Sequence, residues 1–133
     1  MFHTVGFFRE LNSGHESQVF EGSMHDLICD EPSSDEEKLC SYVGGGHAVV
    51  DIMGAEVDIV SKDVYIGGGA SILTDGIWVW RKDLSHYLRR YHLRLSGQFV
   101  DHVRDVSYTM PEISRERLVD ATNYVVKRIF GTS

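Results

Sequence analysis

The stretch 72–80 constrains the fold more than any other part of the chain. Two β-prone runs there flank the Asp-Gly dipeptide at 75–76, which tolerates the positive φ values of a two-residue type I′ turn. Such a turn would place Leu73 opposite Trp78. Because both faces of the hairpin carry large apolar side chains, we expect it to be covered on both sides.

An amphipathic helix is predicted directly after the hairpin. Apolar residues recur there at helical spacing and form one stripe, at Leu84, Tyr87, Leu88 and Tyr91. Basic residues gather near the C-terminal end of this helix, where they suit the helix dipole. We expect the basic residues of the region to form a solvated helix face, and they are Arg81, Lys82, Arg89, Arg90 and Arg94.

The rest of the chain combines short strand-like runs with helical patterns. Alternating or apolar runs predict strands at 2–11, 17–24, 47–53, 56–60 and from 64 to 66. Capping residues and apolar spacing predict helices starting within 32–37, through 99–106 and from Ser114 to Ile129. We therefore predict a single domain (1–133) of the α+β class. It would contain an antiparallel sheet of about four to six strands covered by helices, with a helical C-terminal part.

The net charge of −7 is unevenly distributed along the chain. Residues 1–66 contain 13 acidic and 3 basic residues, whereas residues 67–133 contain 7 acidic and 10 basic residues. Such an acidic field repels nucleic acid and anionic membranes, and it attracts cationic partners. An acidic surface can also serve only to keep a protein soluble. The charge therefore argues against nucleic acid and anionic membrane as partners, and it is compatible with a cationic partner.

No motif predicts a cofactor, a metal site or catalytic machinery. Cys29 and Cys40 are too few for a disulfide scaffold. Their spacing relative to His25 and His47 does not match a compact zinc site. The chain also has no basic leader with an apolar segment behind it, and no apolar run of membrane-spanning length. We expect a cytoplasmic protein that needs neither cofactor nor metal.

The order of residues from Thr74 to Phe99 resembles a pattern of small bacterial immunity proteins. These proteins accompany polymorphic toxins and contact-dependent inhibition toxins. The pattern is a turn, a tryptophan-bearing strand, a helix start and a short apolar segment; here it corresponds to Thr74-Asp75-Gly76, Trp78 and Trp80, Asp83-Leu84 with Tyr87, and Leu95 with Phe99. The match covers about a fifth of the chain. The resemblance implies a protein that is not an enzyme and that binds and neutralises one cognate toxin, with the motif residues serving the architecture.

The charge distribution suits that implication, because a nuclease toxin that grips phosphates is basic and an acidic inhibitor would be steered towards it. We therefore expect the binding face to include acids of the N-terminal half. The first set is Asp26, Asp30, Glu31, Asp35, Glu36 and Glu37. The second set is Glu56, Asp58 and Asp63.

Two other classes of function remain open. The chain could be a small enzyme or ligand-binding domain with a pocket near the hairpin of Trp78 and Trp80. Such a pocket would need polar groups that converge on it and have perturbed pKa values. A weaker alternative is a structural subunit of an acidic assembly.

Overall fold

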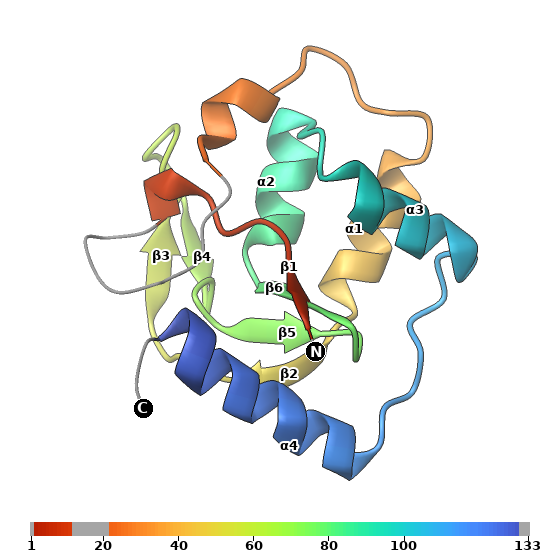
Figure 1. Cartoon of the computed structure of the whole chain (residues 1–133). Coiled ribbons are helices and arrows are strands. Elements are labelled where there is room, and N and C mark those ends of the chain that lie inside the picture. Colours follow the sequence, from red (N-terminus) through yellow and green to blue (C-terminus); the bar gives the residue numbers. More distant parts are fainter. Residues whose placement is uncertain (1, 12–21, 131–133) are drawn as a thin grey trace.

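The computed structural model describes residues 2–11 and 22–130 and has an α+β fold (Figure 1), as predicted. The helices are α1 (Glu36–Gly44), α2 (Leu84–Tyr91), α3 (Gly97–Asp105) and α4 (Arg115–Tyr124). The strands are β1 (His3–Thr4), β2 (His47–Val50), β3 (Ala55–Val57), β4 (Tyr65–Gly67), β5 (Ile72–Thr74) and β6 (Trp78–Arg81). Short 3-10 turns lie at Arg9–Leu11 and Met24–Leu27, and a π-helical turn at Val125–Ile129 continues α4.

The strands form two sheets. One has four strands in the order β1-β6-β5-β2, and the other is the antiparallel ribbon β3-β4. The expectation of a purely antiparallel sheet needs one correction, because β1 pairs with β6 in the parallel direction. The N-terminal segment thereby covers the edge that the β5-β6 hairpin alone would leave open. The predicted strand over 2–11 is limited to β1, and residues 17–21 of the predicted strand 17–24 lie outside the described residues.

The hairpin of β5 and β6 forms as predicted, but its register differs. Leu73 pairs with Trp80 and Thr74 with Val79, so four residues separate the innermost pair and the predicted two-residue turn is wrong. The carboxylate of Asp75 explains the difference, since its Oδ1 accepts hydrogen bonds from the backbone N–H groups of Ile77 (2.9 Å) and Trp78 (2.7 Å). The pairing moves by two residues, which leaves every side chain on its expected face.

The hairpin is covered on both sides, as expected. Leu73, Trp78 and Trp80 belong to the core that includes residues of α1, α2 and α3. Ile72 and Val79 belong to a second core, which includes apolar residues of α4 and of the π-helical turn. Figure 1 shows α4 on one side of the four-stranded sheet and α1, α2 and α3 on the other. The sheet is therefore the middle layer of the fold.

The helices bury the faces that their sequence patterns indicated. Leu84, Tyr87 and Leu88 of α2 are buried, as are Phe99 and Val103 of α3. Ser114 caps the last helix, as predicted. A serine was also expected to cap α1, but Asp35 precedes this helix and its side chain forms no capping hydrogen bond. None of the helices within residues 2–11 and 22–130 is both long and apolar enough to span a membrane.

Candidate functional site

Many carboxylates of the acidic N-terminal half are bonded to basic groups of the C-terminal half. We call this set of contacts the charge clasp. It consists of the pairs Asp35–Arg104, Glu36–His92, Glu37–Arg89, Asp58–His86, Asp58–Arg90 and Asp63–Arg90. The clasp joins α1 and the β3-β4 region to α2 and α3, and α1 lies beside α2 (Figure 1). Opposite charges that are far apart in the sequence therefore meet within the molecule.

Asp35 anchors the start of α1 to α3. Its Oδ2 accepts a hydrogen bond from Arg104 Nε at 2.9 Å and another from the Tyr108 hydroxyl at 2.7 Å. The bond from Arg104 is the main reason that the pKa of Asp35 falls to about 2, against an opposing effect of partial burial. Asp35 therefore acts as a structural contact between two helices.

Asp58 is a fully buried carboxylate, with 0% of its side chain exposed. It accepts hydrogen bonds from the Tyr91 hydroxyl (2.9 Å) and from the backbone N–H groups of Val60 (2.9 Å) and Ser61 (3.0 Å), and His86 Nε2 lies 2.7 Å away. Burial alone would raise the pKa of Asp58, but these hydrogen bonds outweigh it and hold the pKa below its ordinary value. Asp58 thus lies outside any surface that a partner could touch in this conformation.

Four other predicted acids have partners, and only one of them is buried. This one is Glu36, with His92 Nδ1 at 3.0 Å from both carboxylate oxygens. Glu37 and Asp63 are exposed, and each is held by an arginine of α2. Glu56 is exposed and lies 3.8 Å from Arg81 Nη2. These contacts compensate much of the charge that the sequence alone assigns to a binding face.

Three predicted acids are left without a cation. Asp26, Asp30 and Glu31 are exposed, and their carboxylates form no ion pair or hydrogen bond with the described part of the chain. We call residues 26–31 the acidic segment. Arg94 holds this segment in place, because its Nη2 donates a hydrogen bond to the Glu31 carbonyl at 3.0 Å and its N–H donates to the Leu27 carbonyl.

Sequence analysis missed a buried ion pair between Arg81 and Asp83. The guanidinium donates two hydrogen bonds to the carboxylate, at 3.1 Å from Nε and 2.9 Å from Nη2. Asp83 is 0% exposed and Arg81 only 11% exposed, so the expected solvated face does not include Arg81. Burial raises the pKa of Asp83, and the charge of Arg81 opposes that shift.

Asp75 forms a second buried network at the hairpin tip. Its Oδ2 accepts a hydrogen bond from the Tyr42 hydroxyl at 2.6 Å and lies 2.9 Å from His102 Nε2. The Asp-Gly motif indicated a turn here, but it carried no sign that the carboxylate would also bind α1 and α3. The network ties the hairpin tip to both helices and serves the architecture.

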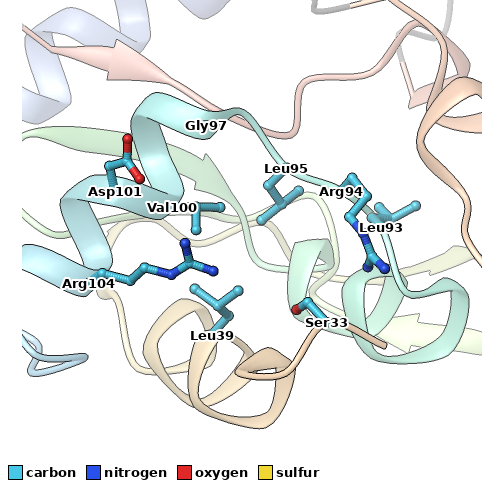
Figure 2. Close-up of a pocket in the computed structure, with 9 residues that line it drawn as sticks. All are labelled: Ser33, Leu39, Leu93, Arg94, Leu95, Gly97, Val100, Asp101 and Arg104. Carbon is cyan, nitrogen blue, oxygen red and sulfur yellow. The ribbon is translucent and has the colours of Figure 1, made fainter. Parts of the chain in front are cut away.

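A pocket of about 200 Å³ lies between α1, α3 and the connection before α3 (Figure 2). Its lining residues are Ser33, Leu39, Leu93, Arg94, Leu95, Gly97, Val100, Asp101 and Arg104. In Figure 2 the guanidinium groups of Arg94 and Arg104 lie on opposite sides of the pocket, and Asp101 also lines it. The pocket is thus apolar with cationic walls, on a protein of net negative charge.

The sequence also left open a ligand pocket beside Trp78 and Trp80, and this space is occupied by side chains. Both tryptophans are buried against Phe99, with ring centroids 5.3 Å and 5.6 Å away. The Trp80 indole also donates a hydrogen bond to the Val43 carbonyl at 3.0 Å. Aromatic rings therefore fill the space beside the hairpin.

The side chains that could bind a metal or act as nucleophiles are dispersed. Within residues 2–11 and 22–130, no group of three or more His, Cys, Asp or Glu residues is placed to hold a metal ion. Cys40 is buried, and burial raises the pKa of its thiol, which disfavours the reactive thiolate. Cys29 is a half-buried free thiol.

The chain was compared with family models, with curated proteins and with solved structures, and none of them matched.

Proposed function

We propose that this chain is a binding protein without catalytic activity of its own, an immunity protein that neutralises a cognate bacterial toxin in the cytoplasm. The observation that carries the proposal is the acidic segment 26–31, whose three carboxylates are exposed and have no cationic partner among the described residues. Unpaired surface carboxylates of one sign steer a basic partner and pair with it on contact. A basic nuclease toxin is a partner of that kind.

The acidic segment is held in a defined conformation, which favours binding. Glu10 accepts a hydrogen bond from the Met24 N–H at 2.8 Å and another from the Ser23 hydroxyl, and the Met24 side chain is buried. The Cys29 N–H also donates to the Tyr91 carbonyl at 3.2 Å. A surface that is ordered before binding loses less conformational entropy when a partner docks.

The buried aromatic hairpin is consistent with the architectural role that the proposal gives to the motif residues. The residues through which the chain resembles immunity proteins include Trp78, Trp80, Asp83 and Tyr87, and all four are buried. Buried residues hold a fold together, while exposed ones are available to a partner. In this proposal the motif provides the frame, and the acidic segment provides the contact surface.

Charge reversal in the acidic segment tests the proposal. A candidate toxin encoded beside the gene would be purified as a catalytically inactive variant, and its association rate would be measured by stopped-flow fluorescence at low and high salt. Replacing Asp26, Asp30 and Glu31 together with lysine is expected to slow association by about tenfold or more at low salt, because electrostatic steering is lost. The difference should shrink at high salt, since salt screens the charges.

A matched variant separates local contact from overall charge. Glu112, Glu116 and Asp120 are also exposed, and replacing them with lysine changes the net charge by the same amount. This control should slow association much less. Equal slowing by the two variants would exclude the acidic segment as the contact surface. Failure of the chain to bind the toxin, or to protect cells in which both are co-expressed, would contradict the immunity function.

A further inference from the structure

We propose that the pocket of Figure 2 binds a small organic acid, with the carboxylate between Arg94 and Arg104 and a short apolar body against the aliphatic wall. This ligand site goes beyond the proposed function and does not depend on it. The inference rests on three features of the pocket, which are its cationic donors, its charge balance and its apolar lining.

The two guanidinium groups have hydrogen-bonding capacity left for a ligand. Arg94 donates to the carbonyls of His92 (3.2 Å) and Glu31 (3.0 Å), and neutral carbonyls leave its positive charge uncompensated. Arg104 donates to Asp35 through Nε and Nη2 and also interacts with Tyr108, which leaves part of its five N–H donors for a ligand. A planar carboxylate matches the donor geometry of guanidinium groups.

The charge balance of the pocket fits a monoanion. The lining contains two arginines against one carboxylate, that of the exposed Asp101, and Arg104 is also paired with Asp35. Arg94 forms no ion pair with any described carboxylate, so its positive charge is available to an anionic ligand. The N-terminus of α3 adds to the positive potential, because Gly97 is its first residue and the Ser96 side chain does not cap it.

The apolar lining selects the body of the ligand. Leu39 and Leu93 are buried, and Leu95 and Val100 are partly buried, so four aliphatic side chains line the pocket together with the two arginines. The volume of about 200 Å³ is smaller than a site for a drug-sized molecule. These features fit a short acyl or single-ring carboxylate, and they disfavour a purely polar anion.

Titration of the full chain with hexanoate, followed by ¹H–¹⁵N NMR, tests this site. We expect saturable shifts of the backbone amides of Arg94, Gly97 and Val100. Hexanol, which lacks the carboxylate, should bind at least about tenfold more weakly, because it cannot form the charge-assisted hydrogen bonds. Across acetate, butyrate and hexanoate, affinity should rise by about two- to fourfold for each methylene group that enters the pocket.

Two glycine variants separate the pocket from general surface binding. Gly97 lines the pocket and a Cβ there would meet no atom within 4 Å, so Gly97→Leu adds a side chain at the pocket without a clash at Cβ and should weaken hexanoate binding by about tenfold or more. Gly44→Leu is the matched control, because Gly44 is also helical, has equally open space and lies outside the pocket. It should bind hexanoate as the parent protein does.

Removal of the uncompensated charge completes the test. Arg94→Gln should weaken hexanoate by about tenfold and leave the weak binding of hexanol unchanged, and a well-dispersed spectrum would show that the variant is folded. Equal shifts with hexanoate and hexanol, shifts that never saturate, or hexanoate binding retained in Gly97→Leu would each overturn the proposal.

Discussion

Replacing Asp58 with alanine is expected to lower the free energy of unfolding by about 3 to 5 kcal/mol. The substitution removes a buried acceptor, which takes hydrogen bonds from the Tyr91 hydroxyl and from the N–H groups of Val60 and Ser61 in part-buried positions. These donors lose their acceptor at part of the cost of desolvation, and His86 and Arg90 lose a buried carboxylate partner. Urea denaturation monitored by circular dichroism at neutral pH measures the change.

Two further variants show whether the charge or the hydrogen bonds dominate at this position. Asp58→Asn keeps the size of the side chain and one carbonyl acceptor, so its loss should be smaller than that of Asp58→Ala but still substantial. Asp63→Ala removes an exposed partner of the same Arg90 and should have a much smaller effect. Similar stabilities of Asp58→Ala and the parent protein would contradict a structural role for Asp58.

Replacing Arg81 with methionine is expected to cost about 3 to 5 kcal/mol, because it leaves the carboxylate of Asp83 buried without its cation. The substitution also removes the hydrogen bond from Arg81 Nη1 to the Leu11 carbonyl, at 3.2 Å. Methionine approximates the length of the arginine stem, so most of the loss reports on the charge. Thermal and urea denaturation of the variant and the parent protein provide the measurement.

The pH dependence of this loss identifies its cause. Burial raises the pKa of Asp83, and removing Arg81 raises it further, so the folded variant binds a proton more tightly than the unfolded chain does. The penalty should therefore be smaller at pH 5 than at pH 8. The double variant Arg81→Met/Asp83→Leu should recover much of the lost stability, since no unpaired charge remains. A loss that is independent of pH and persists in the double variant would point to packing instead.

The sequence predicted the faces of the central hairpin but missed its register. Alternation with a period of two residues determines the face of each side chain, and a shift of two residues preserves it. The register depends on a local competition that composition does not reveal, because the Asp75 carboxylate accepts two backbone N–H groups in place of a two-residue turn. Aspartate favours such turns through its side chain as well as through its tolerance of positive φ.

The uneven distribution of charge along the chain was recognised, but the pairing of its two halves in space was not. The acids were expected on an outer face and the arginines of α2 in solvent. In the fold Arg89 contacts Glu37, 52 residues away, and Arg104 contacts Asp35, 69 residues away. Contacts at such separations depend on how the helices pack. The complementary signs of the two halves were the available signal that they could pair with each other.

The pocket of Figure 2 could not be predicted from the sequence for a similar reason. Its lining comes from the region of α1, the connection after α2 and α3, and the residues of each segment match ordinary helix or loop patterns. Phe99 was recognised as an apolar residue of α3, and it is buried. Only the packed fold shows that Val100 and Arg104 of the same helix line a pocket.

The charge clasp also determines how stability changes with pH. The pKa values of Asp35, Asp58 and Asp63 are lowered in the folded chain. A lowered pKa means that the unfolded chain binds protons more tightly, so these contacts stabilise the fold fully above the ordinary pKa of aspartate. Their contribution is lost as the pH falls through the lowered values. Acid should therefore destabilise the protein by loosening α1 and the β3-β4 region.

The pKa of the Asp35 carboxyl group, measured by ¹³C NMR during a pH titration of the folded protein, tests most directly whether the acidic half is engaged within the molecule. The hydrogen bonds from Arg104 and Tyr108 predict a value of about 2. A value at the ordinary 3.8 would contradict the charge clasp and would return Asp35 to the acids available to a partner.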